Sequence, residues 1–343
     1  MKNVNVSTVD MVNIKINGIA CRAPAGSTIL DAAHSAGIAI PTLCYLKELN
    51  SIGACRMCVV EVKGAKNLVA SCVYPIAEGM EIWTNTERVQ ASRRTNLKLI
   101  LSIHNQTCLT CTRSGVCELQ RLCREYGVDN QMAFEGEKID YQPDESAVHM
   151  VRDNSKCIMC RRCEAVCSLA QGVACIGTAG RGFATHIGPS FDAPLDTTQC
   201  IHCGQCIIAC PTGALYEKDN TALVWNALDD PGKHVIVQTA PSVRAGLGEM
   251  FNLPIGTNVE GKMAAALRRM GFDGVFDTDF AADLTIMEEA SEFLHRVQSG
   301  GTLPLITSCC PGWVKFCETF YPDFIPNLST CKSPQQMFGA MAK

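Results

Sequence analysis

Two runs of four cysteines are the residues of this chain most clearly placed for chemistry. Both have the spacing C-x2-C-x2-C-x3-C, and they begin 43 residues apart, at Cys157 and at Cys200. Thiolates at x2 spacing lie on one tight loop and converge on a cubane [4Fe–4S] cluster, while the fourth cysteine of such a run binds a second cluster. Structural zinc also uses C-x2-C pairs. Two interlocking runs of four favour iron–sulfur clusters over zinc.

The double run resembles a bacterial two-cluster ferredoxin. Pro211 follows the last cysteine as in that motif, whereas Ser168 stands in the matching place of the first run. The first predicted cluster has the ligands Cys157, Cys160, Cys163 and Cys210. The second has the ligands Cys200, Cys203, Cys206 and Cys167.

Length and composition limit the class of protein. A chain of 343 residues is expected to form two or more domains. Its 30 basic and 34 acidic residues give no sign of a nucleic-acid partner. Residues 1–11 are polar, without a signal-peptide core, and no apolar run reaches the ~18 residues of a membrane span. The 22 clustered cysteines suit metal ligation in a reducing cytoplasm better than disulfides.

The N-terminal segment has the pattern of a hairpin followed by a short helix. Residues 12–16 and 19–22 flank the turn dipeptide Asn17-Gly18, and Ser27 or Thr28 caps a predicted helix over 29–35 that ends at Gly37. A hairpin crossed by a helix is how a plant-type ferredoxin begins.

Four cysteines follow this hairpin with the spacing C-x10-C-x2-C-x13-C. They are Cys44, Cys55, Cys58 and Cys72. Gly53 leaves the loop free to point backbone N–H groups at sulfur. The arrangement resembles the [2Fe–2S] domain of NADH dehydrogenase large iron–sulfur subunits and of iron-only hydrogenases, with zinc or free thiols as the alternatives. Cys21, on the hairpin, is read as a small core residue.

His104 stands three residues before another cysteine run, after a predicted helix over 87–101. The pattern is His104-x3-Cys108-x2-Cys111-x5-Cys117. An isolated histidine is usually solvated or hydrogen-bonded, but this pattern resembles the His-ligated [4Fe–4S] site of the same two families. A neutral nitrogen in place of one thiolate is expected to raise the cluster's potential. Cys123 is read as structural, and residues 130–150 as a connection.

The last third has the strand–helix alternation of an α/β domain. Strands are predicted over 234–238, 275–276 and 303–306, and helices over 243–250, 262–270, 283–298 and 312–321. Short strands are also predicted before it, at 184–187 and 221–224. Pro311 suits the first position of the last helix, so Cys309 and Cys310 lie at a helix N-terminus, which favours thiolate.

Residues 307–313, Thr-Ser-Cys-Cys-Pro-Gly-Trp, resemble the first active-site signature of the iron-only, or [FeFe], hydrogenases. The order of the preceding cysteine sites is similar to that of the long, NAD-linked members, so the resemblance covers nearly the whole chain. It implies that Cys310 binds the active-site [4Fe–4S] subcluster and that Cys309 passes a proton to the di-iron centre. It also implies a proton relay formed by Glu289, Ser329, Glu292 and Arg296. The di-iron pocket would be lined by Pro241, Ser242 and Gln335.

The family's second and third signatures, Met-Pro-Cys-x-x-Lys and the Met-Ala-Cys-x-x-Gly-Gly-Cys type, are absent from the sequence. Because they supply the other cysteine ligands, we expect the active-site cluster, or H-cluster, to form only if those segments are supplied. Cys331 is placed near the pocket and Cys317 in the packing. No G-x-G-x-x-G follows a strand, so no nucleotide or flavin is placed on this chain.

The sequence therefore predicts a multidomain α+β and α/β protein. Its expected parts are a plant-type, β-grasp [2Fe–2S] domain over 1–88, a His/Cys3 [4Fe–4S] domain over 89–145, a two-cluster ferredoxin over 146–222 and a partial hydrogenase domain over 223–343. The resemblance implies reversible reduction of protons to H2, with one [2Fe–2S] and three [4Fe–4S] accessory clusters. The implied partners are an NAD(P)-binding flavin/iron–sulfur subunit and a small [2Fe–2S] subunit. The alternatives are an NADH dehydrogenase electron-transfer subunit and a catalytically inactive sensor or scaffold.

Overall fold

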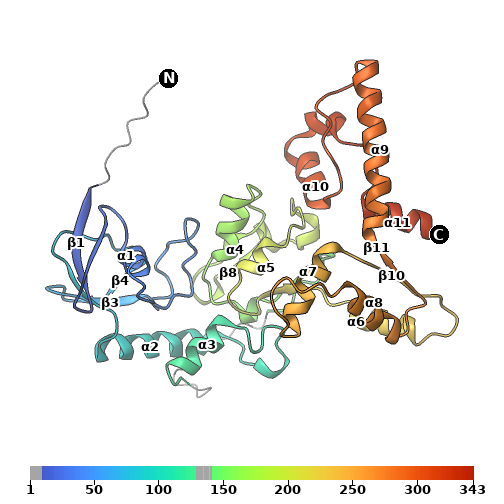
Figure 1. The fold of residues 1–343 in the computed structure, drawn as a ribbon. Coiled ribbons are helices and arrows are strands. Elements are labelled where there is room, and N and C mark those ends of the chain that lie inside the picture. Colours follow the sequence, from blue (N-terminus) through green and yellow to red (C-terminus); the bar gives the residue numbers. More distant parts are fainter. Residues whose placement is uncertain (1–9, 129–133, 135–138, 140) are drawn as a thin grey trace. The chain divides into compact units, whose positions relative to one another are not determined.

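The computed structural model describes residues 10–128, 134, 139 and 141–343 (Figure 1). The chain divides into two compact units. The first contains the chain up to Lys218, except Ile201–Cys203, and the second contains Ile201–Cys203 and Asp219–Lys343. Part of the connection predicted over 130–150 lies outside the described residues. Among the described helices, none is long and apolar enough to cross a membrane.

A five-stranded sheet in the order β2-β1-β5-β3-β4 forms the N-terminal part of the first unit. Its strands are β1 (Met11–Ile16), β2 (Ile19–Pro24), β3 (Val59–Val62), β4 (Val69–Ala70) and β5 (Glu81–Trp83). The β1–β2 hairpin turns at Asn17 and Gly18, whose φ angles of 52° and 83° are the left-handed values that this turn requires. The pair β1–β5 is parallel, and the other neighbours are antiparallel.

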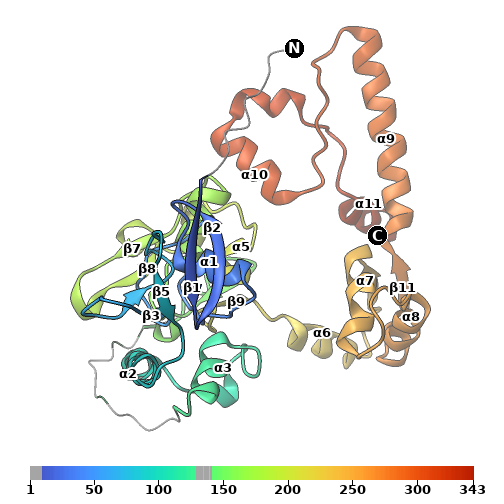
Figure 2. The same ribbon diagram turned by 60° about the vertical axis from the view of Figure 1, so that its left-hand side comes forward.

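Helix α1 (Ile29–Ser35) covers this sheet. Thr28 and Asp31 form its capping box. Ile29, Ala32 and Ala33 of the helix are buried in one core with Ile14 and Ile16 of β1. Figure 2 shows α1 lying against the β1–β2 hairpin.

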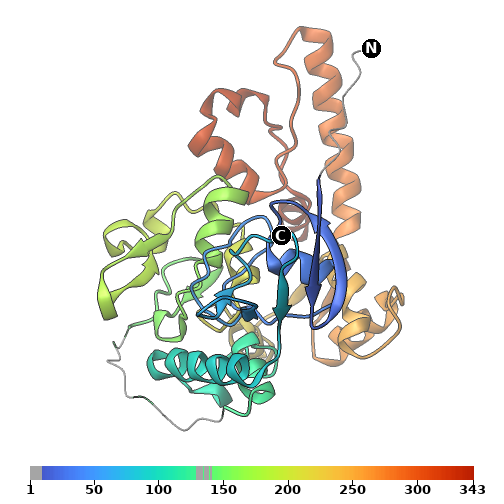
Figure 3. The same ribbon diagram turned by 90° about the vertical axis from the view of Figure 1, so that its left-hand side faces the viewer.

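Helices α2 (Glu87–Ile103) and α3 (Glu118–Glu125) share a second core with the cysteine loop that precedes β3. Leu97 and Leu101 of α2 pack with Leu119 and Leu122 of α3 and with Met57. In Figure 3, α2 lies beside the sheet near β3. The short 3-10 helix η1 (Cys108–Thr110) lies between α2 and α3.

The rest of the first unit consists of short elements around the double cysteine run. Two antiparallel pairs join β6 (Met150–Arg152) to β9 (Leu215–Glu217) and β7 (Gly177–Ala179) to β8 (His186–Gly188). The helical segments are η2 (Asn154–Lys156), α4 (Arg162–Ala165), the π-helical η3 (Val166–Ala170), η4 (Gly182–Ala184), η5 (Ser190–Asp192), η6 (Leu195–Thr197) and α5 (Gln205–Ala209).

The second unit carries a two-stranded parallel sheet, β10 (Ile236–Thr239) with β11 (Gly274–Asp277). Its helices are α6 (Thr221–Leu228), α7 (Pro241–Met250), α8 (Glu260–Arg269), α9 (Thr278–Ser299), α10 (Pro311–Phe320), η7 (Pro322–Asn327) and α11 (Pro334–Ala342). Helix α9 ends at Gly300, whose φ of 71° is the left-handed value of a C-terminal cap. Helix α11 packs beside α9 (Figure 1).

Three predicted strands differ from the structure. Residues 221–224 begin helix α6, because the Asp219 carboxylate accepts hydrogen bonds from the Thr221 N–H and hydroxyl at the start of the helix. Residues 303–306 form a single bridge from Ile306 to Leu328, and Pro304 has no N–H to extend a ladder. Residues 184–187 contain the end of η4 and only the start of β8.

Candidate metal centres and acid–base network

The four cysteines predicted to bind the [2Fe–2S] cluster come close to one another. Cys44, Cys58 and Cys72 are fully buried and Cys55 is half-buried, and the Sγ atoms of Cys58 and Cys72 are 3.3 Å apart. Hydrogen bonds from the neighbouring thiols of Cys55 and Cys72 lower the pKa of Cys44 to about 2. The same contact with Cys44, together with burial, raises the pKa of Cys55. Ionisation of one thiol thus depends on its neighbours, as it must where four sulfurs gather at one point.

The loop before β3 explains why these thiols gather. Gly53 and Arg56 have left-handed φ angles of 60° and 55°. The loop turns the N–H groups of Ala54 and Cys55 toward Cys44 Sγ. Four reduced thiols with backbone donors aimed at sulfur fit a [2Fe–2S] cluster, whose potential depends on such hydrogen bonds.

Asn50 links this site to the first ferredoxin-like run. Its side-chain Nδ2 donates to the carbonyl oxygen of Cys44 at 2.7 Å and to that of Cys160 at 2.9 Å. The side chain is buried, so both amide protons are satisfied away from water. Nothing in the cysteine spacing predicted this residue.

His104 lies at the C-terminal end of α2 and is buried, with 7% of its surface exposed. A hydrogen bond from the N–H of Asn105 to the Ser155 carbonyl, 2.9 Å long, fixes the following residue. Cys117 lies close enough to Cys108 and Cys111 for these thiols to act on it, and burial is the main cause that raises the Cys117 pKa. The histidine leads directly into the loop that carries these three thiols.

Gly213 lies unusually close to this histidine–cysteine site. A Cβ atom built on Gly213 would stand 2.5 Å from Cys111 Sγ. Cys117 Sγ also lies 3.7 Å from the carbonyl oxygen of Pro211. The segment after Cys210 thus forms one wall of the site, and only a glycine leaves room there for the Cys111 sulfur.

The four thiols predicted for the first ferredoxin-type cluster line one hollow. Cys157, Cys160, Cys163 and Cys210 face it together with apolar residues such as Ile187. Met159 and Arg161 have left-handed φ angles of 56° and 59°. This loop conformation brings the Met159 N–H to within 3.4 Å of Cys157 Sγ.

Burial raises the pKa of Cys157 to about 11 and that of Cys160 to about 12. In both cases a second cause is the neighbouring thiol of Cys210. Four thiols that line one hollow, two of them fully buried, fit a cationic iron core as their common partner.

The four predicted ligands of the second ferredoxin-type site differ in burial and in their neighbours. Cys200 is buried, and the half-buried Cys206 lies 3.9 Å from Met150, measured from Sγ to Sδ. Cys203 is exposed and belongs to the tripeptide Ile201–Cys203 of the second unit. Cys167 Sγ lies 3.6 Å from the Sγ of Cys175, a cysteine without a partner in the sequence pattern.

In the second unit, Cys309 and Cys310 precede helix α10, and Pro311 is the first helical residue, as predicted. Cys310 is the N-cap residue, and both thiols are exposed. The residues predicted to line the pocket lie at one edge of the β10–β11 sheet. Pro241 and Ser242 begin α7 directly after β10, and the Gln238 side chain of β10 donates to the Gln335 carbonyl at 3.2 Å.

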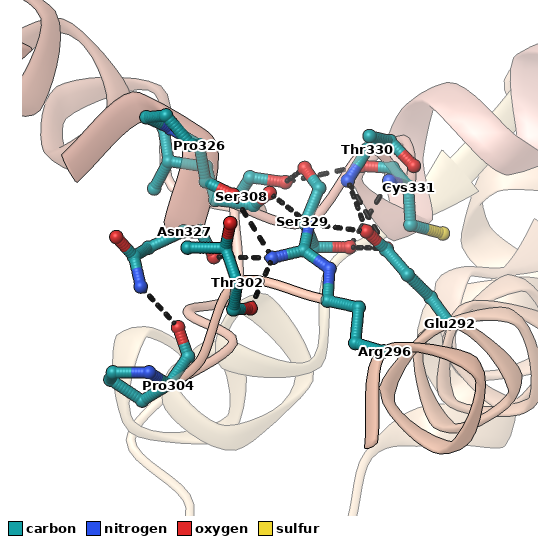
Figure 4. Close-up of polar contacts among 11 residues, drawn as sticks. Glu292, Arg296, Thr302, Pro304, Ser308, Pro326, Asn327, Ser329, Thr330 and Cys331 are labelled. Atoms are coloured by element: carbon teal, nitrogen blue, oxygen red, sulfur yellow. Dashed lines mark hydrogen bonds and ion pairs between the residues drawn. The ribbon is translucent and has the colours of Figure 1, made fainter. Parts of the chain in front are cut away.

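Glu292 is the centre of the acid–base network (Figure 4). Its carboxylate accepts hydrogen bonds from Ser329 Oγ at 2.8 Å, from Arg296 Nη2 at 2.6 Å and from the Thr330 N–H at 3.2 Å. Burial alone would raise the pKa of Glu292, but these three donors lower it below its ordinary value of 4.5. Glu292 is thus held as a carboxylate.

Arg296 ties this carboxylate to the loop after α10. Its guanidinium donates to the carbonyl oxygens of Pro326 at 3.0 Å and Leu328 at 2.8 Å, and to that of Thr302 at 3.2 Å. Figure 4 shows the guanidinium between Glu292 and these carbonyls. The side chain is 12% exposed, so it is a packed structural group as well as a charge.

The remaining relay residues lie around this pair. Glu289 is half-buried one turn earlier on α9, and its charge, after burial, contributes to the raised pKa of Cys331. Ser329 Oγ accepts from the Cys331 N–H at 3.1 Å. The network joins Ser329, Glu292 and Arg296 by hydrogen bonds. Thr330, a member of it, was not predicted.

Four family models match successive parts of the chain. They are the 2Fe-2S iron-sulfur cluster binding domain over 9–87, the NADH-ubiquinone oxidoreductase-G iron-sulfur binding region over 93–132, the 4Fe-4S binding domain over 193–216 and the iron only hydrogenase large subunit, C-terminal domain, over 233–343. The chain is therefore a multidomain iron–sulfur protein of helices and sheets with hydrogenase-type sequence in its last third.

Two curated relatives match nearly all of the chain. It is 52% identical to the NADP-reducing hydrogenase subunit HndD of Solidesulfovibrio fructosivorans, over 98% of this chain and 59% of that protein. It is 42% identical to iron hydrogenase 1 of Clostridium pasteurianum, over 97% of this chain and 58% of that one. The chain thus spans less than two thirds of the length of these relatives.

A solved structure has a fold similar to that of this chain. A chain of an NAD+-reducing [NiFe]-hydrogenase in the H2-reduced state superposes with a TM-score of 0.57 at 30% identity, covering 61% of this chain and 88% of that one. The matched family models, the two relatives and the order of the cysteine sites all indicate the same similarity, to iron-only hydrogenases. Over nearly its whole length the chain is therefore similar to iron-only hydrogenases, and residues 233–343 match the family model of the large subunit's C-terminal domain.

Proposed function

We propose that this chain carries electrons through four accessory iron–sulfur clusters to and from a hydrogenase site. The observation that carries the proposal is the gathering of reduced thiols at the positions that the spacing predicts, most completely in the hollow lined by Cys157, Cys160, Cys163 and Cys210. The clusters, when bound, would supply one-electron redox chemistry, with potentials set by their ligands and surroundings.

The ligand sets follow from the sequence pattern, and the structure supports them to different degrees. Cys44, Cys55, Cys58 and Cys72 would hold the [2Fe–2S] cluster, and His104 with Cys108, Cys111 and Cys117 the first [4Fe–4S] cluster. The two ferredoxin-type clusters would take the remaining eight cysteines of the double run. We propose a plant-type fold for the N-terminal sheet over 1–88, and domains over 89–145, 146–222 and 223–343 for the rest.

The reaction proposed for the whole enzyme is the reversible reduction of protons to H2. Electrons would be exchanged with an NAD(P)-binding flavoprotein subunit and a small [2Fe–2S] subunit in the cytoplasm, where thiols stay reduced. The names of the relatives, an NADP-reducing hydrogenase and an NAD+-reducing hydrogenase, support this pairing. An NADH dehydrogenase subunit is disfavoured by the hydrogenase-type match over 233–343.

Within the hydrogenase-type domain, we propose that Cys310 binds the active-site cluster and that Cys309 donates protons. Ser329 and Glu292 would move protons along their 2.8 Å hydrogen bond. Glu289 would connect them to Cys309, and Arg296 would keep Glu292 ionised and in place. Pro241, Ser242 and Gln335 would line the pocket at the edge of the small sheet.

Iron analysis tests the proposal. Anaerobically reconstituted chain should bind about 14 iron atoms, the sum of one [2Fe–2S] and three [4Fe–4S] clusters, and show several EPR signals on reduction. Stoichiometric zinc with little acid-labile sulfide would refute the electron-transfer role, since zinc has no redox chemistry.

A further inference from the structure

Cys175 is the fifth thiol of the second ferredoxin-type site. Its Sγ lies 3.6 Å from that of Cys167, and its side chain also lies beside that of Cys200. Both neighbours are predicted ligands of the same cluster. All three cysteines belong to the first unit.

The backbone holds this arrangement in place. After the π-helical turn η3, the N–H groups of Val173 and Ala174 donate to the Cys167 carbonyl at 3.0 and 3.1 Å, which folds the chain back on itself. Ala174 has a left-handed φ of 53°, a conformation that a non-glycine residue adopts only where its surroundings impose it. The backbone of this closed loop therefore places Cys175 beside Cys167, so the short distance between the two sulfurs does not depend on side-chain rotamers alone.

We propose that Cys175 is an alternate ligand of the second ferredoxin-type cluster, able to replace Cys167 on iron. The inference rests on the proposed iron–sulfur function of the chain. The exchange needs no oxidant: the Cys175 thiol loses its proton as it forms an Fe–S bond, and the Cys167 thiolate takes up a proton as its Fe–S bond breaks. Iron and cluster charge are unchanged. Such a reserve thiol would let the cluster survive damage to its remote ligand.

Alanine substitutions in the 343-residue chain test this, with iron content and EPR as readouts. Wild type and Cys175→Ala should each bind about 14 iron atoms. Cys167→Ala should keep about 14, with a shifted EPR signal from one cluster, and Cys167→Ala/Cys175→Ala should fall to about 10. The matched control is Cys210→Ala, which removes the corresponding remote ligand of the other half, where Sγ has Thr212 Oγ1 at 3.7 Å as its polar neighbour. This control should also fall to about 10.

The outcomes separate the two proposals. A wild-type chain without iron–sulfur clusters would refute the proposed function itself. Normal wild-type iron with a loss of four iron atoms in Cys167→Ala would overturn only the role of Cys175. Retention of the cluster in the double variant would overturn it too, since another group would then be the substitute. If the alanine variant does not fold, as judged by circular dichroism, Cys167→Val, whose side chain cannot bind iron, is measured by the same criteria.

Discussion

Replacement of Gly213 by alanine tests the histidine–cysteine site at its tightest point. The added methyl carbon would stand 2.5 Å from Cys111 Sγ, whereas unbonded heavy atoms settle at about 3.5–4.0 Å. The sulfur or the backbone must therefore move by about 1 Å. Metal ligands tolerate displacements of only about 0.2 Å. Relief of the clash is thus incompatible with iron ligation by Cys111.

The two routes of relief have different costs. If the Cys111 side chain rotates away, the fold keeps its stability but loses a cluster ligand. If the backbone moves, the other contacts of the new methyl group, Lys156 Cδ at 3.7 Å and Arg113 Cβ at 3.8 Å, are disturbed as well. Overpacking of that kind costs about 1–3 kcal/mol. Either route should remove the His104-linked cluster.

The assay is iron content with EPR on the reconstituted chain. Gly213→Ala should lose about four iron atoms and one set of signals. The matched control is Gly246→Ala in the exposed middle of α7, where nothing lies within 4 Å of the new methyl group. It should retain all iron and gain about 0.5–1 kcal/mol of stability from helix propensity. Full iron content and unchanged spectra in Gly213→Ala would show that the Cys111 sulfur does not occupy this position when iron is bound.

Three further predictions address individual residues. His104→Cys should keep its cluster at a lower potential, because an anionic ligand replaces a neutral one, and His104→Ala should lose or convert it; redox titration with unchanged potentials in both variants would remove His104 from the ligand set. The lowered pKa of Glu292 makes its carboxylate a source of stability that is complete above its ordinary pKa of 4.5 and is lost as pH falls through the folded value. Acid unfolding of wild type should therefore diverge from that of Glu292→Gln as pH rises toward 4.5 and run parallel above it, whereas a constant difference at every pH would contradict the assignment. In the assembled holoenzyme, Cys309→Ser should retain the active-site cluster but turn over far more slowly, since a hydroxyl is a poor proton carrier. Cys310→Ser should instead impair assembly of the cluster itself. Full activity in Cys309→Ser would show that Cys309 is not the proton donor.

Local chemistry made much of the fold predictable. The Asn17-Gly18 turn, the Thr28 cap and the Gly300 stop define their elements because each residue type is required by the backbone there. Helix α11 was missed although its signal was present: Ser333, Pro334 and Gln336 form a capping box around a proline at the first turn.

Sequence-based predictions failed where hydrogen bonds formed in the folded chain overrode the local pattern of residue types. The β-branched and apolar residues 221–224 suggested a strand, but a helix starts there, where the Thr221 N–H and hydroxyl donate to the Asp219 carboxylate. In the candidate sites, the cysteine spacing predicted the ligand sets, but it carried no information about residues contributed from distant segments. Asn50, Gly213 and Cys175 act through contacts that form only in the folded chain, and no spacing rule reports them.

The buried amide of Asn50 has a consequence for electron transfer. One side chain spans the carbonyl groups of Cys44 and Cys160, which are predicted ligands of two different clusters. Electron tunnelling falls steeply with the distance between two redox centres, so thermal fluctuation of that distance spreads the transfer rate. The Asn50 side chain, hydrogen-bonded to both loops, restrains this distance and so narrows the spread of transfer rates. A shorter side chain at position 50 would leave both clusters assembled yet let the gap between them vary, and the loss would be seen in transfer kinetics while iron content stayed the same.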